Sequence, residues 1–307
     1  MTIPIARSSY AAVIVAYNPA ISRLSALMKS LRFISGHRYI VDNASGNAAA
    51  IRLLAKEYGF VYLQNTENRG IAQAINHFEQ ALPDSITAFI PFDQDSIPQI
   101  HYCDCIFEKL IHQSRLGISI AAIGGQVIDT PHERQLKFVR ITWRGVTELD
   151  ASSVDVQPDY LIISGTMISR EAFRKSGGFD EQLFVDNVDV EWSYRVSTLG
   201  YRLVGTHLAS MMHCIGDSEL SIPGTALQLN VHSPARMRFM TKSRFLSYRK
   251  ASLPMQWKLQ DFLRFCVKTL LIMAYSDERS PMLKAVLKGA MEGATEAISI
   301  AGKTGPT

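Results

Sequence analysis

The first 93 residues alternate short apolar runs with segments whose apolar residues recur every three or four positions. The runs at 10–17, 39–45, 60–65 and 86–93 predict buried strands, because each is continuous, short and bounded by polar or turn residues. The segments between these runs have the spacing of helices. Strands without polar alternation that take turns with helices indicate an α/β fold, with a mostly parallel, Rossmann-like sheet flanked by helices on both faces.

Polar residues gather where these predicted strands end. They are Asn18, Asp42, Asn43, Asn65, Asn68, Asp93 and Asp95. In open α/β sheets, ligands bind in the crevice outside the carboxyl ends of the strands. The sequence therefore predicts a binding site along this edge.

Asp93 and Asp95 are separated only by Gln94, in the stretch FDQDS. Two carboxylates at a strand end repel each other unless a cation neutralises them. Oxygen ligands suit Mg²⁺ or Mn²⁺, and Mg²⁺ is commonly held by one or two carboxylates together with substrate phosphates. The alternative is a solvated loop in which both acids are without function.

Two further features fit a nucleotide diphosphate at this edge. Asp42 can accept a hydrogen bond from the N3–H group of a uracil or thymine ring. The segment 65–76 leads through Arg69 and Gly70 into a predicted helix, whose first amides can meet a phosphate. The alternative for Asn68 and Gly70 is an ordinary turn and helix cap.

The pattern loosens after residue 125, where 138–145 predicts a strand of an antiparallel extension and 160–169 a core strand. The charge balance also changes along the chain. Residues 1–235 carry 19 Lys and Arg against 23 Asp and Glu, whereas residues 236–276 carry nine against one. We therefore expect two parts: a nucleotide-binding catalytic domain at 1–235 and a basic, amphipathic helical region at 236–307.

Other bulk features favour a cytoplasmic protein. No run of 18 uncharged apolar residues predicts a membrane span, and the first ten residues lack the apolar region of a secretory signal. The cysteines lack zinc-site spacing and favour a reducing compartment. They are Cys103, Cys105, Cys214 and Cys266.

Several motifs occur in an order that resembles glycosyltransferase family 2, and most of all the bacterial rhamnosyltransferases of polysaccharide and O-antigen assembly. The motifs are VIVAYNP, IVDNAS, NRGIAQAIN, FDQDS, SGTMISREAFRKSGGFDEQLFVDNVDVEW and HCIGD. The resemblance covers roughly residues 10–250. It implies a GT-A fold, a nucleotide-sugar donor, a divalent metal ion and inversion at the anomeric carbon.

The resemblance also implies roles for individual residues. Tyr17 and Asn18 resemble the loop under the base and ribose, and Asp42 resembles the acid that reads the base. Asn68, Arg69 and Gly70 resemble the loop on the diphosphate side, next to Asp93 and Gln94. Asp93 and Asp95 resemble the metal motif, with Asp95 the more direct ligand. His213 resembles a histidine that completes metal or diphosphate binding; its alternative is a structural histidine.

The acceptor side is expected in the stretch FVDNVDVEW. Inverting transfer needs a carboxylate base, and Asp186, Asp189 and Glu191 compete for that role. Most relatives have Glu-Asp here, whereas this chain has Asp186-Asn187, and an amide cannot be the base. We favour Asp186, with Asp189 next, and place Glu191 and Trp192 at the acceptor. Trp192 has core packing as its alternative.

The predicted helix near 258–273 has two distinct faces. Its apolar face contains Leu259, Phe262, Leu263, Cys266, Leu270 and Met273, and the opposite face contains Lys258, Asp261, Arg264 and Lys268. Such a helix can lie on an anionic membrane surface. It can also dock on its own catalytic domain or on a second copy, as in a homodimer. No recognition motif supports nucleic acid as a partner.

Together with these features, the resemblance implies an inverting, metal-dependent transferase that moves rhamnose from dTDP-rhamnose to a lipid-linked oligosaccharide at the inner face of the cell membrane. One alternative is a transferase with a UDP-hexose donor. A nucleotidyltransferase is less favoured, because AYNPAISRL lacks the glycine-rich loop expected after the first strand. A catalytically silent sugar-binding or scaffold protein is the alternative from another class.

Overall fold

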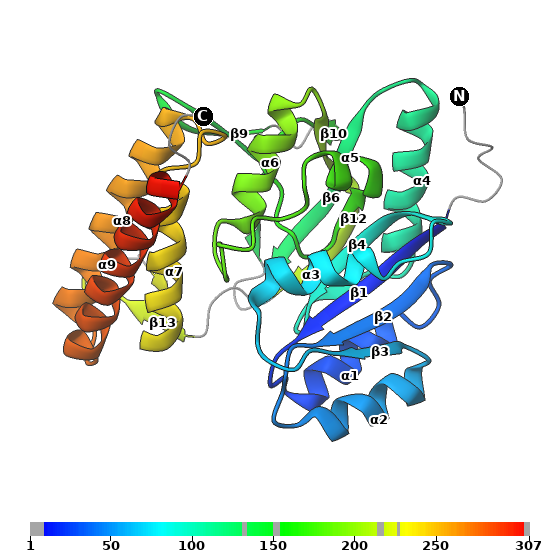
Figure 1. The fold of residues 1–307 in the computed structure, drawn as a ribbon, viewed down its shortest axis with the longest axis horizontal. Helices are drawn as coiled ribbons and strands as arrows, with labels where there is room; N and C mark the ends of the chain where they lie inside the picture. Colours follow the sequence, from blue (N-terminus) through cyan, green and yellow to red (C-terminus); the bar gives the residue numbers. More distant parts are fainter. Residues whose placement is uncertain (1–8, 131–133, 150–153, 214–217, 226–227, 304–307) are drawn as a thin grey trace.

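A ten-stranded mixed sheet forms the centre of the molecule in this computed structural model, which describes residues 9–130, 134–149, 154–213, 218–225 and 228–303 (Figure 1). Its main path runs in the order β10-β12-β6-β11-β4-β1-β2-β3, while β5 pairs with β12 and β7 with β6. The strands are β1 (Ser9–Ala16), β2 (His37–Asp42), β3 (Val61–Gln64), β4 (Ile86–Asp93), β5 (Ile97–Pro98), β6 (Ile120–Asp129), β7 (Arg134–Gln135), β10 (Asp155–Val156), β11 (Thr166–Ser169) and β12 (Arg202–His213).

The four strands predicted in the first 93 residues are present and parallel to one another. β11 runs antiparallel to both of its neighbours, β4 and β6, whereas β12 is parallel to β6. The predicted α/β class with a mostly parallel sheet is therefore confirmed.

Helices cover both faces of the sheet, and three more form the C-terminal extension at the left of Figure 1. The helices are α1 (Ile21–Ser30), α2 (Ala48–Tyr58), α3 (Gly70–Gln80), α4 (Tyr102–Arg115), α5 (Arg170–Lys175), α6 (Val188–Thr198), α7 (Pro234–Ser247), α8 (Met255–Tyr275) and α9 (Arg279–Lys303). Leu24, Ile51 and Ile106 place α1, α2 and α4 in one hydrophobic core. Ile75 and Phe173 place α3 and α5 in the other, together with α6. No helix among the described residues combines the length and apolarity needed to cross a membrane.

Two predicted strands differ from the structure. The segment 138–145 becomes a separate hairpin of β8 (Val139–Thr142) and β9 (Gly145–Glu148), and a second small sheet pairs β13 (Ser218–Ser221) with β14 (Gln228–Val231). In the segment 160–169 only β11 is a strand, because the chain turns at Gly165, whose φ is 74°. The turn places the Ser164 hydroxyl 3.0 Å from the Asp93 amide, which donates to it.

The predicted boundary between residues 235 and 236 falls inside the first turn of α7. Leu246 of α7 packs in the same core as α3 and α5, so the extension is joined to the sheet by a hydrophobic contact. α9 lies close along α7: a Cβ at Gly289 would be 2.3 Å from the Arg238 carbonyl oxygen. The division into two parts remains a prediction.

A buried ion pair ties α3, β4 and α5 together. Arg170 and Glu79 are 4% and 5% exposed, and the Arg170 Nε donates to Glu79 Oε1 at 2.5 Å. The same guanidinium donates to the carbonyl oxygens of Pro83 and Leu82, at 2.5 and 2.7 Å. It therefore satisfies the C-terminal carbonyl region of α3, which helices otherwise leave unpaired.

Replacing this arginine is expected to destabilise the fold. Arg170→Met should lower the free energy of unfolding by about 3 kcal/mol, because it leaves several buried carbonyl oxygens without a donor and leaves the buried Glu79 carboxylate paired with Arg174 alone. Lys175→Met is the matched control: Lys175 pairs with Glu171 at 2.7 Å on the exposed surface, and its loss should leave the free energy of unfolding nearly unchanged. Urea titration of both variants measures the difference, and equal losses would contradict the role assigned to Arg170.

Candidate active site

Pairing in register brings the ends of β1, β2 and β4 to one edge of the sheet. Ala16 of β1 lies opposite Asp42 of β2, and Val15 lies opposite Asp93 of β4. The predicted polar cluster therefore shares one edge of the sheet, as parallel strands require.

Asp42 holds one part of this edge together. Its side chain is fully buried; Oδ1 accepts from the Ser45 amide at 2.9 Å, and Oδ2 accepts from the Tyr62 hydroxyl at 2.7 Å. Burial and the bond to Asp42 raise the pKa of Tyr62 to about 12. Each carboxylate oxygen has a second lone pair, so Asp42 retains acceptor capacity. Asn18 closes the same loop, because its Oδ1 accepts from the Gly46 amide at 2.8 Å.

Asn43 connects Asp42 to the predicted diphosphate loop. Its Nδ2 donates to Asn68 Oδ1 at 2.9 Å, and its Oδ1 accepts from Asn65 Nδ2 and the Arg69 amide, at 3.0 and 3.1 Å. Asn68 Oδ1 in turn accepts from the Gly70 amide at 3.0 Å. The sequence placed Asn43 in the polar cluster at this edge without a separate role, and it did not point to Tyr62.

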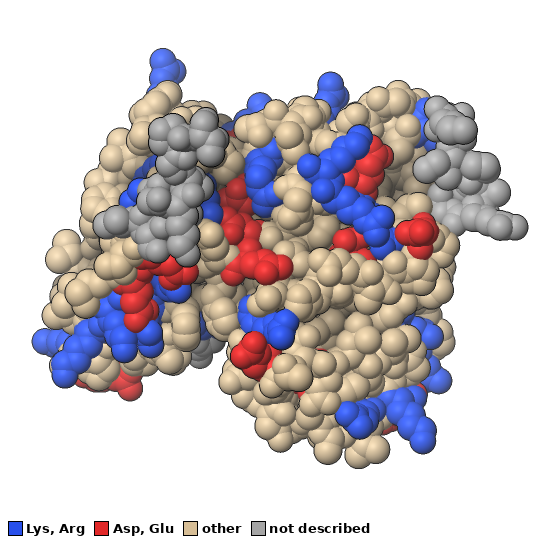
Figure 2. Space-filling model, in the orientation of Figure 1, with Lys and Arg blue, Asp and Glu red and all other residues tan. Residues whose placement is uncertain are grey.

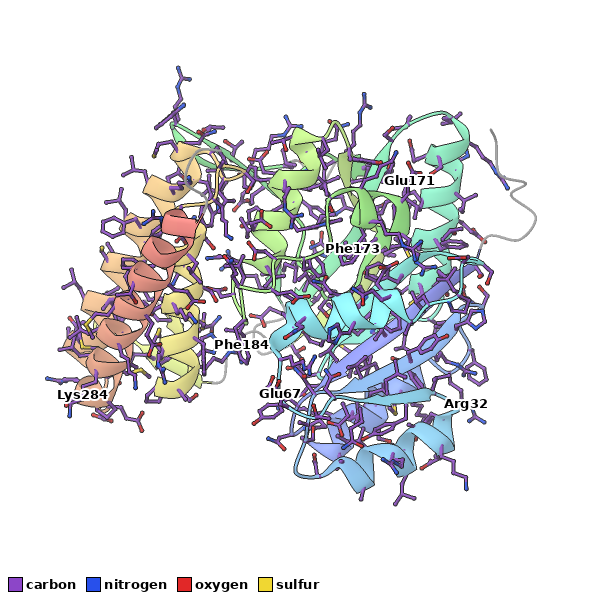
Figure 3. All side chains as sticks on the ribbon, viewed as in Figure 1. Arg32, Glu67, Glu171, Phe173, Phe184 and Lys284 are labelled. Atoms are coloured by element: carbon purple, nitrogen blue, oxygen red, sulfur yellow. The ribbon has the colours of Figure 1, made fainter. Side chains whose placement is uncertain are left out.

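Gly70 is required where α3 begins. Its φ is 74°, and a Cβ there would lie 2.4 Å from the Phe184 carbonyl oxygen, which accepts from the Ile71 amide. Phe184, labelled in Figure 3, also stacks on Phe239 of α7 with ring centroids 4.8 Å apart. The loop before α6 thus contacts both the start of α3 and the C-terminal extension.

The three predicted metal-site residues converge. His213 Nε2 lies 3.8 Å from Asp93 Oδ2, and His213 Nδ1 lies 3.7 Å from Asp95 Oδ1. Ser96 places the ring, since its hydroxyl is 2.9 Å from His213 Nδ1 and 2.7 Å from the Ser164 hydroxyl. Loss of solvation raises the pKa of Asp93, with a further contribution from Asp95.

Among the described residues, no group of three or more His, Cys, Asp or Glu side chains forms a ready-made metal cage. Residues 214–217, the rest of the HCIGD motif, lie outside the described residues. The two carboxylates still fit a divalent ion of the Mg²⁺ type, which takes only a few ligands from the protein and others from substrate phosphates. Gln94 has a structural role beside them: its Oε1 accepts from the amide of the half-exposed Tyr17 at 2.9 Å.

Asp186 and Asp189 flank the start of α6. Asn187 between them has a φ of 63°, the left-handed conformation that asparagine tolerates better than most residues. Burial raises the pKa of Asp186, and the nearby Arg244 lowers it. Burial and the charge of Asp186 raise the pKa of Asp189 to about 7. The Asn187 Nδ2 is buried and has no hydrogen-bond partner among the described residues.

Glu191 and Trp192, predicted for the acceptor role, are both buried. Glu191 is 3% exposed; it accepts from Arg195 at 2.9 Å and from the Ser252 hydroxyl at 2.9 Å, so its charge is already paired. Trp192 is also 3% exposed and packs against Phe173 and Phe179, with centroids 6.1 and 5.6 Å apart. Both side chains belong to the packed side of α6, so their burial does not favour the acceptor role, which remains a prediction.

The C-terminal extension contributes a cation to this region. Arg244 of α7 lies 3.5 Å from Asp186 Oδ2 and donates to Asp261 Oδ2 of α8 at 2.8 Å. The Tyr248 hydroxyl donates to the same Asp261 oxygen at 2.7 Å. In Figure 2, acidic side chains gather in the hollow between α6 and the extension. Sequence reasoning missed Arg244, because only the folded chain brings α7 to α6.

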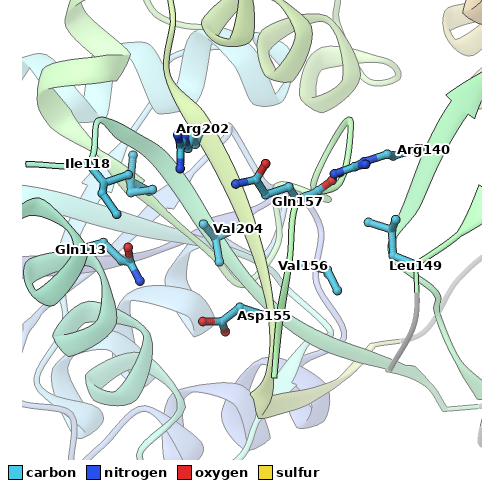
Figure 4. A pocket seen from close by; sticks show the side chains of 10 residues that line it. Gln113, Ile118, Arg140, Leu149, Asp155, Val156, Gln157, Arg202 and Val204 are labelled. Atoms are coloured by element: carbon cyan, nitrogen blue, oxygen red, sulfur yellow. Dashed lines mark hydrogen bonds between the residues drawn. The ribbon is translucent and has the colours of Figure 1, made fainter. Parts of the chain in front are cut away.

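Two cavities lie near strands β6 and β12 or the loop before β11. The larger, about 360 Å³, is lined by residues such as Gln113, Asp155 and Arg202, near the amino ends of β6 and β12 (Figure 4). It lies at the other end of these strands from Asp129 and His213, and we assign it no part in the site. The smaller, about 270 Å³, includes Ser164, Tyr160 and Lys137 in its lining, so it adjoins the Ser164 hydroxyl bonded to the Asp93 amide.

Comparison with known proteins gives one curated relative. The chain is 28% identical over 291 residues to dTDP-rhamnosyl transferase RfbF of Shigella flexneri, covering 93% of this chain and 95% of that protein. No protein-family model matches the chain.

Solved structures share the fold. The structure of GalNAc-T7 with UDP, GalNAc and Mn²⁺ matches with a TM-score of 0.57 at 14% identity, over 86% of this chain and 56% of that one. TarS of S. aureus matches with a TM-score of 0.50 at 12% identity, over 88% of this chain and 44% of that one. The chain thus spans only about half the length of these structural relatives. These structures give the chain a GT-A fold, and the similarity to RfbF along nearly the whole chain supports a glycosyltransferase.

Proposed function

We propose that the protein transfers rhamnose from dTDP-rhamnose, with inversion, to a lipid-linked oligosaccharide during cell-surface polysaccharide (O-antigen) synthesis at the cytoplasmic side of the membrane. The observation that carries the proposal is the convergence of Asp93, Asp95 and His213 at the edge of the sheet where Asp42 and the Asn68 loop lie. The choice of dTDP-rhamnose rests on the similarity to RfbF over nearly the whole chain.

A UDP-linked hexose is the second candidate for the sugar donor. Its support is the shared fold of GalNAc-T7, whose structure holds UDP. Thymine and uracil both present an N3–H group to an acceptor such as Asp42. The nucleotide tests below therefore include both bases.

We call this edge of the sheet, with Asp42, the Asn68 loop, Asp93, Asp95 and His213, the rim. The residues at the rim have distinct tasks in this reaction. Asp93, Asp95 and His213 would hold a divalent cation, which supplies positive charge to the leaving diphosphate when bound. The Gly70 and Ile71 amides are committed to Asn68 and Phe184, so the Arg69 guanidinium is the group of this loop that we assign to a phosphate. The bond from the anomeric carbon to the diphosphate breaks as the acceptor oxygen bonds to the opposite face of that carbon.

We assign the general base to Asp189 in preference to Asp186. A base works best when its pKa lies near the working pH, and that of Asp189 is about 7. Asp186 instead faces Arg244 and contributes its charge, which raises the pKa of Asp189. Asp189 accepts the proton of the attacking hydroxyl, and the buried Asn187 amide can donate a hydrogen bond to a substrate oxygen.

We place the acceptor sugar in the 270 Å³ cavity, in place of Glu191 and Trp192. Ser164 connects the lining of this cavity to Asp93, and Tyr160 connects it to the start of α6, where Tyr160 packs in the same cluster as Val190. Arg134 and Lys137 supply cations that suit hydroxyl oxygens or the phosphate of a lipid carrier.

Metal and donor binding are expected to fail together when the rim acids change. Asp95→Asn should cut turnover on the order of 100-fold and abolish the Mn²⁺-dependent rise in Tm with dTDP, dTDP-rhamnose, UDP or UDP-glucose. Asp84→Asn is the control, because its side chain is 97% exposed away from the rim. A scaffold protein would show no turnover, and an unchanged thermal shift in Asp95→Asn would remove Asp95 from the site.

The pH dependence distinguishes the two base candidates. With Asp189 as base, kcat/KM should rise with pH through about 7, because only the ionised carboxylate accepts a proton. Asp189→Asn should lower kcat on the order of 100-fold and leave nucleotide affinity unchanged. Asp186→Asn should shift the rise of kcat/KM to lower pH, because it removes a charge that raises the pKa of Asp189. If Asp186→Asn abolishes turnover and Asp189→Asn does not, Asp186 is the base.

The proposed acceptor cavity is tested through Lys137. Lys137→Ala should raise the KM for the acceptor about tenfold, because one charge-assisted hydrogen bond is lost, with nucleotide affinity unchanged. Lys29→Ala, an exposed lysine on α1, is the matched control. Steady-state kinetics at saturating sugar donor provide the measurement, and an acceptor KM equal to that of the control would place the acceptor elsewhere.

A further inference from the structure

Helix α8 turns its apolar face away from the protein. Most of the residues predicted to form that face are exposed, among them Leu259 (49%), Leu263 (55%) and Leu270 (69%), and Val267 joins them at 56%. An amphipathic helix on a globular protein ordinarily buries its apolar stripe. α8 buries Trp257 and Ile272 on its inward side but leaves this stripe exposed, so packing against its own chain does not account for the stripe.

The polar face of α8 is the one that packs inward. Asp261 is 8% exposed and bonded to Arg244 and Tyr248. Lys258 Nζ donates to the Lys250 carbonyl oxygen at 2.8 Å, and burial lowers the pKa of Lys268. Two of the cations that suggested electrostatic membrane binding are thus used inside the molecule, and only Arg264 of the four polar-face residues is exposed.

A second apolar feature adjoins α8. The β8–β9 hairpin, beside α8 in Figure 1, carries Trp143 and Val146 at 69% and 45% exposure. Gln260 of α8 donates to the Thr142 carbonyl oxygen at 2.5 Å, which fixes the hairpin against the helix. Tryptophan is enriched where proteins meet the boundary between lipid and water, because its ring is apolar and its N–H polar.

We propose that an apolar lipid-facing surface, formed by Leu259, Leu263, Val267 and Leu270 of α8 with Trp143 and Val146 of the hairpin, lies in the boundary region of an anionic lipid bilayer. The helix lies in the plane of the surface and inserts these side chains among the acyl chains. This goes beyond the basic-helix contact predicted from the sequence, because the apolar face supplies the binding energy. It rests on the proposed function only for its purpose, which is to meet a lipid-linked acceptor.

The charges around this surface favour lipid over a second copy of the chain. The one acid of α8, Asp261, is buried and paired, whereas Arg264 and the hairpin residues Arg140 and Arg144 are exposed and outnumber Glu148, the exposed acid of the hairpin. Anionic headgroups complement these cations, each worth about 1 kcal/mol near such a surface. A two-fold contact between copies through the same face would bring like charges together.

Flotation with vesicles tests the surface. The full-length protein should bind vesicles of phosphatidylcholine with phosphatidylglycerol, and more weakly those of phosphatidylcholine alone. The triple variant Leu263→Gln, Val267→Gln and Leu270→Gln should bind on the order of 100-fold more weakly, because three inserted side chains become polar. The matched control is Leu53→Gln, Leu116→Gln and Leu199→Gln, whose leucines are 70%, 62% and 52% exposed on other elements. The control should bind like the unmodified protein.

Two further measurements make the outcome decisive. Arg144→Gln with Arg264→Gln should weaken binding to anionic vesicles roughly tenfold and leave binding to neutral vesicles unchanged. Sedimentation velocity without lipid measures self-association: a dimer that the triple variant converts to a monomer, with no vesicle binding, would overturn the proposal in favour of a second copy. Equal vesicle binding by the triple variant and its control would also overturn it.

The same variants separate this surface from the reaction. Sugar transfer to a water-soluble acceptor should be unchanged in the triple variant, because no altered residue touches the rim. Protein that binds vesicles but transfers no sugar would contradict the proposed function and leave the lipid-facing surface standing. Protein that transfers sugar but does not bind vesicles would contradict the lipid-facing surface and leave the proposed function standing.

Discussion

The parallel register of β1, β2 and β4 is the constraint on which the site depends. It sets Asp42 opposite Ala16 and Asp93 opposite Val15, so that loops distant in sequence end at one edge. A slip of one residue would turn Asp93 to the other face of the sheet, because side chains alternate along a strand. Burial of Ala12, Ile14 and Ile90 in one core fixes that register. The cost is a pair of carboxylates close together, which the proposed cation would offset.

The sequence predicts this half of the molecule well because its signals are local. Apolar runs, turn residues and polar strand ends are all readable within ten residues, and the four strands and three helices lie near their predicted positions. The bonds that give the edge its shape are harder to foresee. Tyr62 and Ser164 act through atoms that the fold brings to Asp42 and Asp93, and no local pattern marks either residue.

The sequence predicts less well which face of a helix packs inward when its residue spacing allows either face to do so. Helices α6 and α8 are the two examples. α6 is buried on most of its circumference, so spacing does not reveal that Glu191 and Trp192 face the packed side while Asp189 lies within reach of the charge of Asp93. In α8 the two faces are identified correctly, but which one meets the protein depends on partners elsewhere. Arg244 and Tyr248 hold Asp261 by an ion pair and a hydrogen bond, and Trp257 and Ile272 are buried on the same side of the helix.

That same ion pair joins the outer helix to the chemistry. Arg244 contacts both Asp261 of α8 and Asp186, and the charge of Asp186 in turn raises the pKa of Asp189. The position of α8 therefore helps to set the charge distribution around the proposed base. A helix that rests on lipid through its outer face would hold this rim beside the bilayer. Its inner face would keep Arg244 in place, so one helix would serve both the location of the acceptor and the electrostatics of transfer.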